Sequence, residues 1–178
     1  MKKKDAEFIT SRKMRALEIN AEYYGVSLLQ LMENAGRTVA LEIVSRFSRE
    51  QKIAIFCGLG GNGGDGFVVA RHLFSQGFKV SVVLAGEAQN IRHEAAVKNW
   101  RALQPLRGRI SIQEVRDSSA IPNVDAPIVV DALLGTGTKG KLKPPIVQVV
   151  DYINGLAAFK IAVDVPTGID SDSGEVLG

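Results

Sequence analysis

A ten-residue run with six glycines, Cys57–Gly66, separates an apolar segment from a helix-like segment. The apolar segment is Ile53–Cys57 and the helix-like segment is Phe67–Ser75. A strand, a glycine-rich loop and a helix in this order can present backbone N–H groups to a phosphate, and glycines let the main chain adopt positive φ angles and approach a ligand closely. A phosphate site alone does not require Asn62 and Asp65. The run therefore predicts a nucleotide-like ligand together with a cation or a polar sugar.

Helix-like and strand-like segments alternate along the rest of the chain. Two helices are predicted first, at Thr10–Glu22 and Ser27–Phe47, the second from apolar residues at three- and four-residue spacing. Strands are then predicted at 52–57, 79–84, 110–115, 126–133 and 160–165, and helices at 66–75, 91–103 and 145–154. Strands joined through helices form right-handed βαβ units, which indicates an α/β domain with a mainly parallel sheet after two N-terminal helices.

Composition favours a globular domain of a reducing compartment. The chain has 178 residues, of which 46% are apolar, and this suits one domain with a core. The single cysteine, Cys57, excludes an intrachain disulfide and is expected to be a buried structural thiol. There is no secretory signal and no apolar run of about 20 residues, so a cytoplasmic location without membrane contact is expected. The turn at Asp170–Gly174 is typical of the middle of a protein, so the domain at 1–178 is predicted to be C-terminally incomplete.

Three polar, glycine-containing segments follow predicted strands. They are Gly58–Asp65, Asp131–Lys141 and Asp164–Asp170. In a doubly wound sheet, ligands bind outside the carboxyl ends of the strands, and parallel strands place these ends at one edge. We therefore expect the three segments to converge on one ligand.

Two common nucleotide motifs match these segments only in part. Gly58–Gly63 fits the dinucleotide fingerprint, but the acidic residue expected after the second strand corresponds only to Glu87, which lies past that strand. Gly135–Lys141 fits most of a Walker A loop, but Leu142 occupies the position of the magnesium-binding hydroxyl. An ordinary NAD-dependent dehydrogenase and a P-loop NTPase are therefore disfavoured.

Two carboxylates stand at the ends of apolar strands. Asp131 must be paired, hydrogen-bonded or bound to a cation. It either accepts hydrogen bonds from backbone N–H groups of a neighbouring loop or ligates a cation together with Asn62. Asp164 is either a general acid/base or a turn residue, and Thr167 either donates a hydroxyl to a ligand or forms a local turn.

The remaining charged residues and the two histidines are less specific. Lys139 and Lys141 either neutralise a phosphate or are solvated loop charges. His72 and His93 lie in helix-like runs without a partner at metal-ligand spacing, so they are interpreted as structural or surface residues. The three lysines at 2–4 are interpreted as a solubilising tail, and nucleic-acid binding is not expected.

Four segments in order along the chain carry a family resemblance. They are Met32–Arg37, Gly60–Arg71, Val130–Gly137 and Asp164–Asp170. Together they resemble the YjeF N-terminal domain family, the NAD(P)H-hydrate epimerases. The resemblance implies a Rossmann-like three-layer αβα fold, a homodimer, and conversion of the R to the S hydrate of NADH and NADPH (NADHX and NADPHX). An ADP- or ATP-dependent dehydratase, fused or separate, would restore the S hydrate.

The resemblance also implies roles for individual residues. Asn62, Asp131 and Thr167 would hold a potassium ion, and Asp164 would contact the substrate near the reacting ring. We further expect Asp164 to be the catalytic acid/base, because inversion at the hydrated carbon needs proton transfer at its oxygen. The remaining substrate-binding residues would be Gly61, Asn62, Gly63, Gly64, Asp65, Gly135, Thr136, Gly137, Thr138, Lys139, Gly140 and Lys141.

One departure and one alternative accompany the resemblance. Gly61 stands where the family usually has Asn, which removes a side-chain contact but leaves the backbone available. The alternative is a catalytically silent YjeF-type module for nucleotide or RNA binding and dimerisation. Retention of Asn62, Asp65, Asp131 and Asp164 favours the enzyme, because a scaffold would not need these polar groups.

Overall fold

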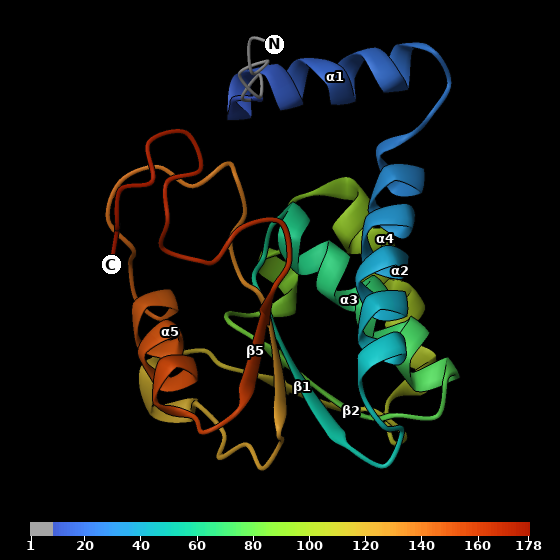
Figure 1. The fold of residues 1–178 in the computed structure, drawn as a ribbon, viewed down its shortest axis with the longest axis vertical. Coiled ribbons are helices and arrows are strands. Elements are labelled where there is room, and N and C mark those ends of the chain that lie inside the picture. Colours follow the sequence, from blue (N-terminus) through green and yellow to red (C-terminus); the bar gives the residue numbers. More distant parts are fainter. Residues whose placement is uncertain (1–8) are drawn as a thin grey trace, which may run out of the picture.

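The computed structural model describes residues 9–178 and is built around a five-stranded parallel sheet (Figure 1). The strands are β1 (Lys52–Cys57), β2 (Lys79–Leu84), β3 (Ser111–Glu114), β4 (Ile128–Ala132) and β5 (Phe159–Ala162). Their order is β3-β2-β1-β4-β5, and every pair is parallel. The strand order reverses between β1 and β4. This arrangement confirms the predicted α/β class, and β1 and β2 have the predicted bounds.

Helices cover both faces of the sheet. The helices of the described chain are α1 (Ser11–Tyr23), α2 (Leu28–Arg46), α3 (Gly61–Ser75), α4 (Glu94–Leu103) and α5 (Ile146–Gly155), with short 3-10 turns at Ala88–Asn90, Gln104–Leu106 and Ser118–Ala120. One apolar cluster joins α2, α3 and α4 to one face, and a second joins α5 to the other (Figure 1). The fold is therefore the expected three-layer αβα arrangement preceded by two helices.

The glycine run is helical where the sequence predicts a loop. Helix α3 begins at Gly61, five residues before the predicted start at Gly66, and none of the glycines from 58 to 66 has a positive φ angle. Packing explains the difference. A Cβ on Gly63 would overlap the carbonyl oxygen of Gly58, and one on Gly66 would overlap Cys57 and Ala132. The missing side chains let the first turns of α3 lie directly against β1 and β4, and this contact offsets the low helix propensity of glycine.

Helix α1 lies apart from the core, across the carboxyl edge of the sheet (Figure 1). None of its residues is buried. At one end, the backbone N–H and hydroxyl of Ser11 donate to the two carboxylate oxygens of Asp172, at 2.7 and 2.6 Å. At the other end, Gly25 turns the chain with φ 93°, and Ser27 and Gln30 form a capping box at the start of α2.

Cys57 ends β1 and is fully buried. Burial, followed by the charges of Asp131 and Asp65, raises the pKa of its thiol far above the ordinary value. The thiol is therefore inert, as predicted for a structural cysteine. No helix within residues 9–178 combines the length and apolar character that crossing a membrane requires.

Candidate functional site

The three segments singled out in the sequence meet at the carboxyl ends of β1, β4 and β5, which are adjacent in the sheet. The backbone N–H of Gly58 donates to Ala132 at 3.0 Å, which joins the first segment to the second. The backbone N–H of Leu134 donates to the hydroxyl oxygen of Thr167 at 3.1 Å, which joins the second to the third. The three segments therefore lie together as predicted, and that they hold one ligand stays a prediction.

Asp131 is tied to the loop that follows β5. Its Oδ1 accepts the hydroxyl of Thr167 at 2.7 Å and the backbone N–H of Leu133 at 3.1 Å, and its Oδ2 accepts the backbone N–H of Thr167 at 2.8 Å. These are the bonds of the first interpretation, in which the carboxylate organises a neighbouring loop. They also leave Asp131 and Thr167 side by side, as the family resemblance implies for a cation site.

The side-chain amide of Asn62 makes no hydrogen bond to the described residues. Its Oδ1 and Nδ2 are both buried and lack a partner in the described part of the chain. A Cβ added to Gly135 would meet both the Asp164 carboxylate and the Asn62 Cβ. Asn62, Gly135 and Asp164 therefore lie close together. A buried polar group without a partner is costly, so this amide indicates a ligand that reaches it.

The side-chain oxygens of Asn62, Asp131 and Thr167 are of a kind that suits a hard monovalent cation. An amide oxygen, a carboxylate and a hydroxyl are oxygen ligands of the kind that such ions prefer, and potassium in particular accepts neutral oxygens. Residues 9–178 contain no cluster of three or more His, Cys, Asp or Glu side chains that could hold a metal ion. Asn62, Asp131 and Thr167 therefore suit potassium in chemical type.

Asp164 is held in an unusual conformation at the end of the fifth strand. Its φ angle is 65°, and it is the one non-glycine residue with a positive φ in the described chain. Its Oδ2 accepts the backbone N–H of Thr136 at 2.7 Å. A left-handed backbone at a residue with a side chain costs energy, and such strained residues cluster at functional sites. The strain turns an exposed carboxylate toward the Gly135–Thr138 turn.

Asp65 has a strongly altered acidity. Burial in the second turn of α3, then the charge of Asp164, then that of Glu18 raise its pKa to about 7. A carboxyl group with this pKa can give or take a proton near neutral pH. The sequence marked Asp65 as a substrate contact only, because burial and the approach of Glu18 from α1 leave no trace in a motif.

The first turn of α3 is an anion site in its geometry. Gly60 precedes the helix without a side-chain cap, and the first main-chain helical bond runs from Gly64 to Gly60 at 3.2 Å. The earlier N–H groups of α3, from Gly61 to Gly63, have no partner within the helix. Unsatisfied N–H groups and the helix dipole both favour a negative charge here.

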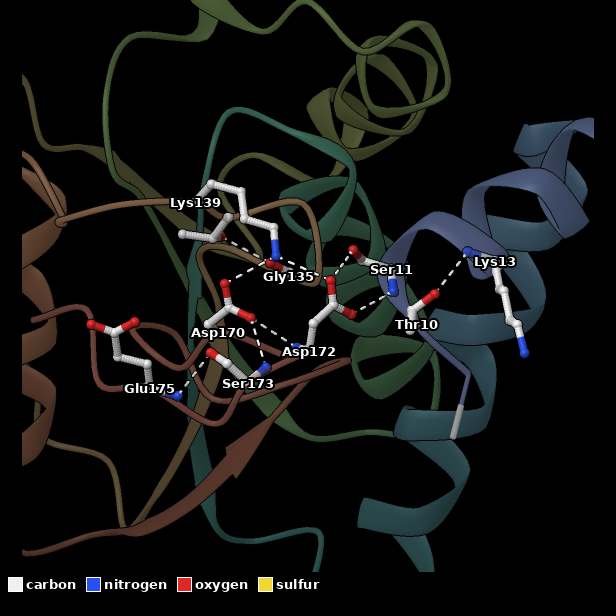
Figure 2. A network of polar contacts seen from close by, with 10 residues as sticks. Thr10, Ser11, Lys13, Gly135, Lys139, Asp170, Asp172, Ser173 and Glu175 are labelled. Carbon is white, nitrogen blue, oxygen red and sulfur yellow. Dashed lines mark hydrogen bonds and ion pairs between the residues drawn. The ribbon is translucent and has the colours of Figure 1, made fainter. Parts of the chain in front are cut away.

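Lys139 is engaged away from this helix. Its ammonium group pairs with Asp170 at 2.9 Å and with Asp172 at 3.1 Å (Figure 2). The pairing with Lys139 and the N–H groups of Asp172 and Ser173 lower the pKa of Asp170 to about 2. Lys141 is exposed. Asp172 also holds Ser11, so this network joins α1 to two of the three converging segments (Figure 2).

The two histidines have different surroundings. His72 contacts Glu33 at 2.7 Å, and Glu33 also pairs with Arg71, so these residues join α2 to α3 in the structural role expected for His72. His93 precedes α4 and lies beside Gly61, with a buried Nδ1 that lacks a partner among residues 9–178. His93 was expected within a helix as a structural or surface residue, but α4 begins one residue later, and its contact with Gly61 was not predictable because Gly61 is distant in the chain.

Comparison with known sequences decides the family. The sequence model described as YjeF-related protein N-terminus matches residues 28–178. The chain belongs to this family. Helix α1 precedes the matched part of this YjeF N-terminal domain.

Relatives of this YjeF domain carry related names. The bifunctional NAD(P)H-hydrate repair enzyme Nnr of Methanothermobacter thermautotrophicus is 50% identical over 166 residues, which are 92% of this chain and 32% of the relative. The NAD(P)H-hydrate epimerase of Cenarchaeum symbiosum is 36% identical over 94% of this chain and 77% of the relative. The chain thus spans about a third of the bifunctional relatives.

A solved structure shares the fold of this YjeF domain. The crystal structure of the yeast protein YNL200c superimposes with a TM-score of 0.76 at 26% sequence identity. The match covers 95% of this chain and 74% of the yeast chain.

Proposed function

We propose that this YjeF domain epimerises NAD(P)H hydrate, interconverting the R and S forms of the hydrated nicotinamide ring. One observation carries the proposal: two carboxylates, Asp65 and Asp164, lie close enough for the charge of one to raise the pKa of the other, beside an uncapped helix N-terminus. The names of the archaeal relatives agree with it.

The substrate would be held by its phosphates. The pyrophosphate is its strongest negative charge, and the N-terminus of α3 offers N–H groups and a favourable dipole. The hydrated ring would then lie toward β4 and β5, where Asp164 and the Gly135–Thr138 turn are joined through Thr136. The substrate contacts expected at Lys139 would require its ion pairs with Asp170 and Asp172 to open.

Inversion at the hydrated carbon needs proton transfer at its oxygen. This carbon bears a hydroxyl and is bonded to the ring nitrogen, so it is a carbinolamine carbon. The hydroxyl oxygen takes a proton and leaves as water while the nitrogen lone pair forms an iminium ion. Water then adds to the opposite face and loses a proton. Ring opening to an aldehyde and reclosure would move protons at the same oxygen.

Asp164 is the proposed acid/base at that oxygen, because it stands at the strand end where the reacting ring would lie. Asp65, with a pKa of about 7, is proposed to give or take protons beside it. Positioned proton transfer of this kind contributes about 10²–10⁴-fold to a rate.

A potassium ion would be held by Asn62, Asp131 and Thr167. When bound, it supplies positive charge close to the substrate phosphates. In its presence the Asn62 amide would gain a partner for its buried Oδ1, and the Asp131 carboxylate would gain a counter-charge. The homodimer and a dehydratase acting on the S hydrate remain predictions.

Chiral chromatography of R-NADHX incubated with the chain tests the proposal. Accelerated conversion to the S form, above the spontaneous rate and lost in Asp164→Asn, is expected. Binding of the hydrate without acceleration would instead support the silent binding module.

A further inference from the structure

One face of α1 encloses a cleft beside the proposed site. The cleft has a volume of about 410 Å³ and lies between α1, the start of α2 and the start of α4. Arg15, Glu18, Ile19 and Glu22 line it, and their three- and four-residue spacing places them on one side of the helix. The opposite walls come from α2 and α4, and they include Leu28 and Ala95.

Helix α1 reaches this cleft by crossing the carboxyl edge of the sheet (Figure 1). Its first residue is fixed to Asp172, beyond the end of β5, and its later turns face His93, beyond the end of β2. β4 and β1 lie between β5 and β2. Three strand spacings are about 14 Å, and a helix of this length is about 20 Å long, so α1 is long enough to span the site.

The cleft comes close to the N-terminus of α3 at His93. His93 lines the cleft and also lies beside Gly61, the first residue of α3. The Cδ2–Nε2 edge of His93 lies toward Gly61, and its buried Nδ1 lacks a partner within residues 9–178. Glu18 reaches from α1 far enough for its charge to act on Asp65. A ligand bound at the α3 N-terminus can therefore extend under α1 without leaving the protein surface.

The order of the strands decides which half of a dinucleotide would do so. Dinucleotides bind across the point where the strand order reverses, with one mononucleotide half on each side. Here that point lies between β1 and β4. Asp164 is on the β4–β5 side, so the reacting nicotinamide half belongs there. The adenosine half is left to the β1–β2 side, where the cleft lies.

We propose that the cleft between α1 and α4 binds the adenosine half of the dinucleotide hydrate, with Ile19 against the base and Glu18 or Glu22 accepting hydrogen bonds from the ribose. The identity of the ligand rests on the proposed function. The chemistry of the walls fits: Ile19, Leu28 and Ala95 offer an apolar surface, and acidic residues bind ribose hydroxyls in other dinucleotide sites.

A matched pair of variants tests the cleft. Ile19 and Leu17 are both exposed apolar residues of α1, at 59% and 52%, but only Ile19 lines the cleft. Neither is buried, so aspartate at either position is compatible with folding. Calorimetric titration with ADP-ribose, which carries the adenosine half and the pyrophosphate, should show binding weakened about tenfold by Ile19→Asp and unchanged by Leu17→Asp.

Kinetics with a truncated substrate give a second readout. The hydrate of reduced nicotinamide mononucleotide lacks the adenosine half. Ile19→Asp should raise KM for NADHX about tenfold and leave KM for the truncated hydrate unchanged. Equal effects of the two variants on ADP-ribose, or an equal rise in both KM values, would overturn the cleft as the adenosine site.

The two proposals fail in distinguishable ways. A chain that binds ADP-ribose with Ile19 dependence but does not epimerise NADHX retains the adenosine site and loses the epimerase function. A chain that epimerises NADHX but binds ADP-ribose equally well in both variants retains the function and loses the adenosine site.

The charges of the cleft add a prediction about the substrate. Three carboxylates, Glu18, Glu22 and Glu94, line it together with two cations, Arg15 and Lys98. Lys98 is already paired with Glu94 at 2.7 Å. A 2′-phosphate on the ribose would meet excess negative charge, so kcat/KM should favour NADHX over NADPHX.

A charge reversal checks this preference. Glu22→Lys should raise the ratio of kcat/KM for NADPHX to that for NADHX. The same change at Asp151, an exposed residue of α5 on the opposite face of the sheet, should not alter the ratio. No change in the ratio for Glu22→Lys would remove Glu22 from the ribose site.

Discussion

Thr167 directs both of its donors at the carboxylate of Asp131, its hydroxyl to Oδ1 at 2.7 Å and its backbone N–H to Oδ2 at 2.8 Å. The end of β4 is thereby fixed to the loop that follows β5. Because the Thr167 hydroxyl also accepts the N–H of Leu134, the segments that follow β4 and β5 share one small network. The network orients the loop that carries Asp164.

Removal of this carboxylate should weaken both folding and ligand binding. Asp131→Ala leaves the buried N–H of Thr167 without an acceptor and its hydroxyl with only the carbonyl oxygen of Leu134 at 3.2 Å, at a cost of about 1–3 kcal/mol in the free energy of unfolding. Thermal denaturation and ADP-ribose titration measure the two effects. Thr167→Ser keeps both donors and is the control, whereas Thr167→Val should lose part of the stability. Wild-type stability and binding in Asp131→Ala would contradict the organising role.

Asp164→Asn should separate chemistry from binding. Asparagine tolerates a positive φ and retains an oxygen for the N–H of Thr136, but it cannot exchange a proton at neutral pH. We expect kcat for epimerisation to fall about 10²–10⁴-fold with little change in hydrate affinity. An unchanged kcat would exclude Asp164 as the acid/base.

Asp65→Asn should stabilise the fold at alkaline pH. The pKa of Asp65 is raised from 3.8 to about 7, so the folded state holds this proton more tightly than the unfolded state. Wild-type stability therefore falls as pH rises from about 4 through about 7, and asparagine escapes this loss. The gain at pH 8 should be on the order of 2 kcal/mol after allowance for water near the carboxylate.

Denaturant titrations of wild type and Asp65→Asn at pH 4 and pH 8 measure this difference. At pH 4 the gain should be small, because Asp65 is protonated in the folded state and about half protonated in the unfolded state. A gain of equal size at both pH values would show that the carboxylate is not desolvated.

Replacement by alanine should reduce stability at one glycine of the run and have little effect at another. A Cβ on Gly66 would meet Cys57 and Ala132, so Gly66→Ala should destabilise the fold by about 1–3 kcal/mol or more. A Cβ on Gly60 would meet nothing within 4 Å, and Gly60→Ala should change stability by less than about 1 kcal/mol. Urea titration compares them. Similar losses in both variants would contradict the packing explanation.

Potassium should stabilise the chain through Asn62. The melting temperature in potassium chloride should exceed that in choline chloride at equal ionic strength, because only potassium can enter a site of protein oxygens. Asn62→Ala removes the buried amide and should abolish the difference. An identical potassium effect in wild type and Asn62→Ala would place the ion elsewhere.

Most of the scaffold was predictable, because the pattern of apolar residues in strands and helices depends only on residues that are close in the chain. Lys52–Cys57 and Lys79–Leu84 are recognisable as strands by their apolar runs, and the alternation of elements determines the class of fold. The helical start of α3 was not predictable in this way. Clustered glycines indicate a loop by propensity, and only contact with β1 and β4 makes this segment a helix.

Contacts between distant residues account for the other omissions. The link between Ser11 and Asp172 spans 161 positions, so no local pattern could show that α1 crosses the site. The neighbour of His93, Gly61, lies on another helix for the same reason. Asp131 and Asp164 were predictable, because a carboxylate at the end of an apolar strand stands out without any knowledge of its partners.

The burial of Cys57 has a practical consequence for following α1 in solution. Its thiol is covered and holds its proton tightly, so thiol-directed dyes and spin labels will not attach to it under mild conditions. A cysteine introduced at Tyr24, which is 81% exposed next to α1, would then be the one reactive thiol among the described residues. Single-site labelling can report on α1 without first removing a native cysteine.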